Sequence, residues 1–154
     1  MPKMSEVPYL FCLYAEDVRQ EVTGQTSIIG VFQGGLRVAA VPTHVPKLAI
    51  VANLRLPPQS APKSIMLEVS RAGEVLETIT PEAALLQSIN RQQKVGRDKG
   101  KGKGEGFTMQ FVIGMTGFAV PTQGKIEVQA IVDGLVVNGN GLEITVGEAS
   151  AEEK

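Results

Sequence analysis

The chain has 154 residues, which is the size of one ordinary domain with one core. Fifteen Lys and Arg residues nearly balance sixteen Asp and Glu residues, so the molecule as a whole has no charge that would attract polyanions. Any such attraction must be local. Seventeen Gly, nine Pro and no Trp indicate many turns and few long helices.

The single cysteine, Cys12, excludes an intrachain disulfide and a zinc site built from several cysteines. It lies inside the apolar run YLFCL, which favours a buried thiol over a reactive one. Residues 1–8 lack the charged and apolar regions of a signal peptide, and no apolar run approaches the roughly 18 residues that span a membrane. We therefore expect a cytoplasmic protein.

Two apolar runs open the chain. Residues 8–15 (PYLFCLYA) predict a strand buried on both faces. Residues 26–32 (TSIIGVF) have the β-branched content of a second strand. Within it, Gly30 indicates a bulge or a close backbone approach.

The polar stretch between these runs carries Glu16, Asp17, Arg19 and Glu21. We predict either one helical turn capped by Asp17 or a wide hairpin loop. Such a cluster could hold a divalent cation or supply an acid and base pair, but it lacks the D-x-[DN]-x-[DN]-G spacing of calcium loops. The structural alternative is that Asp17 caps the turn and Arg19 pairs with a neighbouring carboxylate. We assign no metal and no catalytic role to this turn, whose role stays unknown.

In the middle of the chain, residues 47–56 (KLAIVANLRL) predict a strand that ends at a Pro-Pro pair. Residues 64–80 predict a hairpin around Ala72-Gly73, in which an apolar and a polar face should fix the register. Thr80 as a cap and Pro81 at the first helical position then predict a short helix of roughly three turns.

Residues 95–106 (VGRDKGKGKGEG) lose all pattern, and we predict a mobile basic loop because glycine and like charges both oppose ordering. The loop is no phosphate-cradling P-loop, since it is one residue short and lacks the hydroxyl that follows the lysine. Three interpretations stay open: a solvated loop, salt-sensitive binding of nucleic acid or another polyanion, or a protein partner. The bases that would contact a polyanion are Arg91, Lys94, Arg97, Lys99, Lys101 and Lys103.

The last third returns to strands, over residues 107–118, 125–132, 135–138 and 142–146, with Asp133-Gly134 as a two-residue turn. In total we predict a mainly β domain with eight or nine strands, arranged as an antiparallel β-sandwich of immunoglobulin-like or jelly-roll-like type. It has one short inserted helix and the flexible Gly/Lys loop. This single domain covers residues 1–147, followed by an acidic, frayed tail over residues 148–154.

No catalytic constellation is visible in the sequence. His44, the only histidine, sits between two prolines with no serine, cysteine or second histidine near it, so we interpret it as an exposed loop residue. We predict no enzyme, no cofactor and no metal.

The first third resembles a family of short bacterial and prophage-associated proteins that is catalogued only as a domain of unknown function. The likeness lies in a strand ending CLYAEDVRQEV, then TGQTSIIGVF, then GGL and the proline-flanked strand KLAIVANLRLP, roughly residues 9–80. Its recurring segment is E-D-x-R-x-E followed by G-x-x-S-I-I-G-V. The resemblance implies a compact β-rich domain of bacterial or phage origin and carries over no catalytic residue.

These observations favour a non-enzymatic binding or assembly module, whose strand edges could pair with a protein partner or a second copy. The alternative is binding of nucleic acid or an anionic nucleotide through residues 91–103. A metal enzyme built on Glu16, Asp17 or Glu21 ranks third. A membrane role is not expected.

Overall fold

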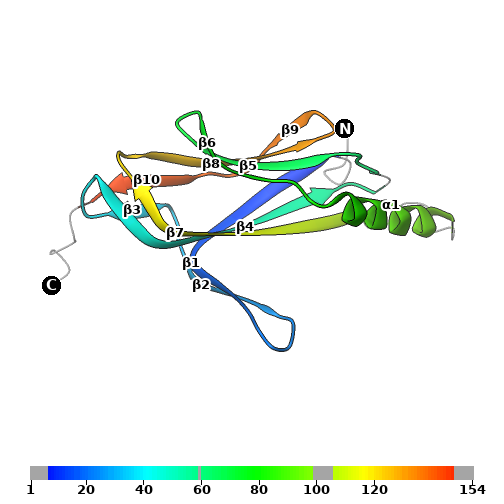
Figure 1. Cartoon of the computed structure of the whole chain (residues 1–154), viewed down its shortest axis with the longest axis horizontal. Coiled ribbons are helices and arrows are strands. Elements are labelled where there is room, and N and C mark those ends of the chain that lie inside the picture. Colours follow the sequence, from blue (N-terminus) through cyan, green and yellow to red (C-terminus); the bar gives the residue numbers. More distant parts are fainter. Residues whose placement is uncertain (1–6, 59, 99–105, 148–154) are drawn as a thin grey trace.

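A computed structural model describes residues 7–58, 60–98 and 106–147. They form ten strands and one helix (Figure 1). In chain order these are β1 (Tyr9–Gln20), β2 (Thr26–Val31), β3 (Leu36–Val38), β4 (Thr43–Leu56), β5 (Ile65–Arg71), β6 (Glu74–Ile79), α1 (Ala83–Asp98), β7 (Phe107–Val120), β8 (Gly124–Val132), β9 (Leu135–Asn138) and β10 (Leu142–Val146).

The strands form two sheets that pack on each other as a sandwich (Figure 1). The first sheet has the order β2-β1-β4-β7, and the second has the order β3-β10-β8-β5-β6, with β9 pairing β8 beside β10. All pairings are antiparallel except that of β3 with β10. The predicted β-sandwich is confirmed and is mostly antiparallel, with ten strands rather than eight or nine because the three-residue run β3 also pairs.

The core lies between the sheets and follows the two-residue alternation of the strands. On β5, every second side chain from Ile65 to Arg71 is buried, and β8 alternates in the same way. The central strand β4 is buried from Leu48 to Ala52 on both of its faces. Strand β4 is therefore the axis of the first sheet.

Strand β1 corrects the expectation that residues 8–15 are buried on both faces. Leu10, Cys12 and Tyr14 point into the core, whereas Tyr9 and Phe11 are 51% and 50% exposed. The difference arises because no described element covers the outer face of the first sheet over Tyr9 and Phe11. An apolar run can mark an uncovered sheet face as well as a doubly buried strand.

The two tight hairpin turns are confirmed. Ala72 and Gly73 both take positive φ, 52° and 81°, as do Asp133 and Gly134, 49° and 84°. The register of β5 with β6 nevertheless shifts at a bulge, and Val75 and Leu76 of β6 are exposed. The prediction that β6, the second strand of this hairpin, has a buried apolar face is therefore wrong.

Helix α1 has 16 residues, longer than the three turns expected, and includes residues 95–98, which the sequence predicts to lie in a mobile loop. Once a helix is nucleated, each added residue gains a hydrogen bond at little further cost, so Gly96 does not end it. Leu86 and Ile89 anchor α1 in the core. The rest of the predicted loop up to residue 105 and the predicted acidic tail lie outside the described residues.

Within the described residues, no helix combines the length and the apolar character needed to cross a membrane.

Candidate interaction site

Beyond Ala15, strands β1 and β2 leave the sandwich as a two-stranded ribbon (Figure 1), which we call the arm, residues 16–31. Its ladder runs from Ala15 opposite Val31 to Gln20 opposite Thr26. The turn is closed by hydrogen bonds from the Glu21 amide to the Gln25 carbonyl, at 2.7 Å, and from the Gly24 amide to the Glu21 carbonyl, at 2.9 Å.

The predicted helical turn or wide loop is therefore wrong. Strand β1 continues to Gln20, because pairing with β2 satisfies the backbone groups of residues 17–20 that a helical turn would otherwise pair locally. Glu16, Asp17 and Arg19 consequently lie on a strand, and only Glu21 lies in a turn.

The arm has no core of its own. None of residues 16–31 is buried, and Val22 at the tip is fully exposed. Cross-strand pairing places Val18 beside Ile28 on one face and Asp17 beside Ile29 on the other. Since an isolated two-stranded ribbon is only marginally stable in water, the arm holds apolar side chains in solvent without the packing that normally stabilises them.

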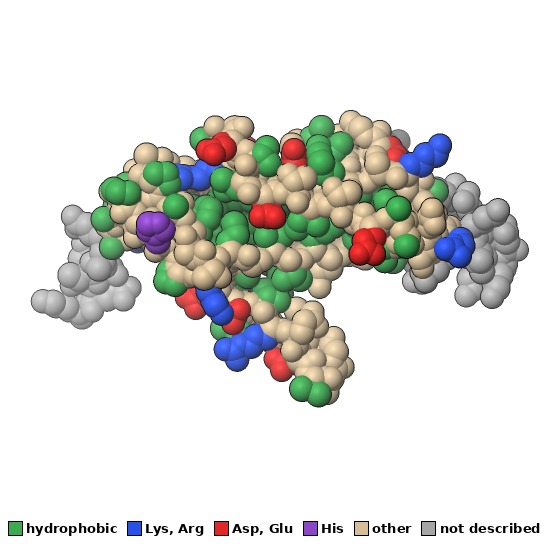
Figure 2. Space-filling view, in the orientation of Figure 1, with side chains coloured by type: hydrophobic (Ala, Val, Ile, Leu, Met, Phe, Trp, Pro, Cys, Tyr) green, Lys and Arg blue, Asp and Glu red, His purple; other side chains and the backbone are tan. Residues whose placement is uncertain are grey.

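Charged side chains gather where the arm leaves the sandwich (Figure 2). Asp17 Oδ2 lies 3.3 Å from Arg19 Nε, and Asp17 Oδ1 lies 3.6 Å from Lys47 Nζ on β4. The hydrogen bond from Arg19 is the largest cause that holds the pKa of Asp17 below its usual value, and the Lys47 charge adds to it. The structure thus gives Asp17 and Arg19 an ordinary surface ion pair.

Glu16 lies on the same stretch and contacts Gly30. Gly30 has φ +70°, and a Cβ atom added there would lie 2.9 Å from the Glu16 side chain. The predicted close approach at Gly30 is confirmed, without a shift of register. Within the described part of the chain, no three His, Cys, Asp or Glu side chains come together in a way that could hold a metal ion.

A groove of about 520 Å³ runs between the base of the arm and the sandwich. Its lining combines apolar side chains, among them Phe32, Leu36 and Val45, with the charged group around Asp17. Protein interfaces likewise combine apolar and polar residues. The lining residues are Glu16, Asp17, Arg19, Ile29, Phe32, Leu36, Val45, Pro46 and Lys47.

The outer face of the first sheet carries partly exposed apolar side chains on the two strands that flank β4. Phe11 of β1 is 50% exposed and lies beside Asn53, and Val112 of β7 is 44% exposed and lies beside Val51, which is itself buried. Sequence reasoning missed the exposure of Phe11 because the apolar run around it predicts a strand buried on both faces.

The predicted polyanion site divides between described and undescribed residues. Arg91 is exposed on α1, and the α1 backbone also includes Lys94 and Arg97. The remaining members, Lys99, Lys101 and Lys103, lie outside the described residues. His44 lies on β4 opposite Ala119, so it is a strand residue rather than the expected loop residue, although it is exposed as predicted.

Cys12 is buried, and burial raises the pKa of its thiol to about 11. Burial likewise raises the pKa of Tyr14, whose hydroxyl donates to the Asn140 carbonyl at 2.7 Å. Asn140 also binds the backbone of Cys12, accepting from its amide at 2.7 Å and donating to its carbonyl at 2.8 Å. These hydrogen bonds connect the two sheets. Because the Cys12 thiol stays protonated, it is a poor nucleophile.

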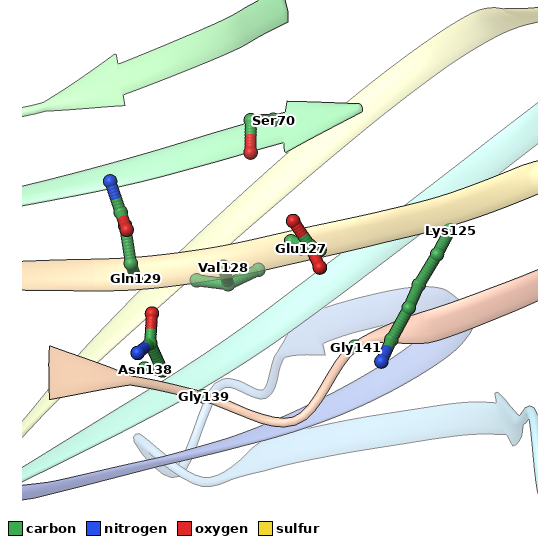
Figure 3. Close-up of a pocket in the computed structure, with 8 residues that line it drawn as sticks. All are labelled: Ser70, Lys125, Glu127, Val128, Gln129, Asn138, Gly139 and Gly141. Carbon is green, nitrogen blue, oxygen red and sulfur yellow. The ribbon is translucent and has the colours of Figure 1, made fainter. Parts of the chain in front are cut away.

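A second hollow, of only about 120 Å³, lies beside the segment that connects β9 to β10 (Figure 3). Lys125 and Glu127 of β8, Ser70 of β5 and Asn138 of β9 line it, together with the adjoining glycines. Ligand pockets are usually about 300–1,000 Å³, so this hollow is too small to take an ordinary small-molecule ligand.

The model of a family described as "Family of unknown function (DUF6941)" matches residues 10–145. The chain belongs to this family. The match includes the arm, both sheets and the basic segment, so membership of DUF6941 extends well beyond residues 9–80, where the sequence alone showed a resemblance. No curated protein and no solved structure matches the chain. Since the description of DUF6941 names no activity, function has to be argued from the surfaces above.

Proposed function

We propose that this member of DUF6941 is a non-enzymatic binding or assembly module that contacts a protein partner through the arm and the groove at its base. One observation carries the proposal: none of residues 16–31 is buried, although they form a regular paired ribbon with apolar side chains on both faces. A partner that covered the arm would supply the packing that the sandwich does not.

Burial of the arm's apolar side chains in an interface would supply enough free energy for specific binding. Val22 is fully exposed, and complete burial of such a side chain contributes roughly 1.5–3 kcal/mol. Ile29 and Val31 are 39% and 41% exposed, so each can contribute about half of that or less. A few anchors of this kind at the centre of an interface are sufficient for specific association. The charged group around Asp17 would then orient the partner.

We further propose a bacterial or phage origin and a role as a phage or prophage accessory protein. The support is the resemblance carried by the E-D-x-R-x-E and G-x-x-S-I-I-G-V segments, which together make up the arm. The proposed function depends on the arm itself and holds for any origin.

Site-specific photo-cross-linking in the cells that encode the protein tests the proposal. A photoreactive residue at Val22 should yield one discrete adduct, whereas the same residue at Leu76, an exposed position on β6, should yield none. Identical products from both positions, or turnover of phosphoesters, peptides or glycosides by the purified protein, would contradict it.

The basic segment supports a second candidate, the binding of nucleic acid or another polyanion. Helix α1 continues through Arg91, Lys94 and Arg97, so these bases recur every three residues along one helix. Replacing Lys94, Lys99, Lys101 and Lys103 by Ala should abolish salt-dependent binding of a DNA or RNA oligonucleotide. Replacing Lys47, Lys63 and Lys125 by Ala is the control and should leave binding intact, while full affinity after the first replacement would exclude this site.

A further inference from the structure

One edge of the first sheet is formed by the long strand β7. Strand β7 pairs with β4 along its whole length, from Phe107 opposite Leu56 to Val120 opposite Thr43. In the ranges that the structure describes, no strand pairs with its other edge. The backbone donors and acceptors on that edge are therefore available to another strand.

Nothing in β7 protects this edge. Its 14 residues, FTMQFVIGMTGFAV, include no charged residue and no proline, the two devices that usually block edge-to-edge pairing. The strands at the two ends of the second sheet do carry charges. Strand β6 contains Glu74 and Glu77, and β3 is only three residues long and contains Arg37. The remaining edge strand of the second sheet, β9, also lacks charge and proline but has only four residues, so among the described strands β7 is the longest edge without protection.

The hydrogen bonds of Asn140 show which backbone groups of β7 lie on the free edge. The amide and carbonyl of Cys12 both bind Asn140, so they point away from β4. Successive residues of a strand alternate in direction. Counting across the registers of β1, β4 and β7, the even-numbered residues of β7 from Thr108 to Thr116 direct their amides and carbonyls away from β4.

We propose that β7 pairs antiparallel with β7 of a second copy, around a two-fold axis at Val112. In this register Val112 lies opposite its own mate, Gln110 lies opposite Gly114, and Thr108 lies opposite Thr116. All of these residues direct backbone groups outward, so each pair can exchange two hydrogen bonds. The inference deepens the proposed assembly function and rests on it, naming a second copy as a partner.

Two features favour a second copy over an unrelated strand. The regular part of β7 is bounded by Gly106 and Gly117, with φ of 75° and 62°, and Val112 lies at its middle. A two-fold axis brings only the residues near it close to their own mates, so a charge there would meet its like, and β7 has none. The joined sheets would also extend the apolar outer face around Val112, which is 44% exposed.

Sedimentation velocity of the purified protein over a wide concentration range tests the inference. The wild type should sediment as a dimer, at twice the 16.4 kDa of one chain. Val112→Lys places two ammonium groups at the axis and removes two apolar side chains from the joined face, and together these changes should raise the dissociation constant ~100-fold. Val75→Lys, on an edge strand of the second sheet with 50% exposure, is the matched control and should leave the dimer intact. A monomeric wild type, or a dimer that survives Val112→Lys, would overturn the inference.

A cysteine at the axis tests the register itself. Val112→Cys should form a disulfide-linked dimer under mild oxidation, because opposed residues in such a pair have Cα atoms about 5.5 Å apart. Gln110→Cys should not, since its mate lies several residues along the strand. The buried Cys12 is present in both variants and serves as an internal control. Loss of the dimer in Val112→Lys with the Val22 adduct retained would separate this inference from the proposed arm contact, and equal cross-linking at both cysteines would refute the register.

Discussion

Asn140 joins the two sheets by taking the place of a neighbouring strand. Its side-chain amide forms hydrogen bonds with both backbone groups of Cys12, and its backbone carbonyl accepts a hydrogen bond from the Tyr14 hydroxyl. Gly139 lets this segment approach, because a Cβ atom there would lie 3.0 Å from Leu10. The N-G-N-G stretch looks like a simple break in the sequence, and only the fold shows that it ties the sheets together across 128 residues of chain.

Replacing Asn140 by Ala should lower the free energy of unfolding by about 1–3 kcal/mol, since two hydrogen bonds to the backbone of a buried residue are lost. Denaturant titration measures this. Asn138→Ala, at an exposed position on β9, is the control and should change stability by less than about 0.5 kcal/mol. Equal effects of the two substitutions would show that the Asn140 bonds contribute nothing special.

Burial of Cys12 should make the folded state less stable as the pH rises in the alkaline range. Its folded pKa of about 11 exceeds its ordinary value of 9.0, so its contribution is complete below pH 9 and is lost as the pH rises to 11. Tyr14, with a raised pKa, acts in the same direction. The wild type should lose a few kcal/mol more than Cys12→Ala between pH 9 and 11, measured by denaturant titration at each pH. Parallel pH profiles for the two proteins would contradict the burial argument.

At the scale of elements, the sequence predicts the tight turns but not which strands pair. Ala72-Gly73 and Asp133-Gly134 were predicted correctly because a two-residue turn depends on the residues within it. The arm was missed because residues 16–20 have little intrinsic strand preference, and only β2 holds them extended. Glu16, Asp17 and Arg19 were identified as a cluster, but their role as the base of an arm depends on Lys47 of β4, which is distant in sequence.

The arm should be the least protected paired element of the isolated protein. Hydrogen exchange resolved by NMR should show amides of residues 18–28 exchanging roughly 10³-fold faster than those of residues 48–54 in the central strand β4. The reason is that the arm has one paired ribbon and no buried side chain, whereas β4 is paired on both sides. Comparable protection in both segments of the isolated protein would mean that the arm is already packed.

At the scale of the whole molecule, the fold class followed from strand lengths, turn spacing and the lack of long helices. The surfaces did not follow, since their positions depend on strand order. The sequence of β7 is as apolar as that of β4, yet β4 lies at the centre of the sheet and β7 at its edge. In the part of the chain that the structure describes, the partly exposed outer face, the unpaired edge of β7 and the exposed arm all arise from that order. Together they leave apolar side chains of the described residues exposed to solvent.

The most direct measurement is the size of the assembly that contains the protein in extracts of the cells that encode it. The variant has residues 18–28 of the arm replaced by Asn-Gly, which closes the ribbon with a short turn. Size-exclusion chromatography should place the wild type in a complex much larger than its own dimer, and the shortened variant at the size of the free protein. If the shortened variant elutes with the wild-type complex, or if the wild type itself elutes as free protein, the claim that this protein acts by contact through its arm is contradicted.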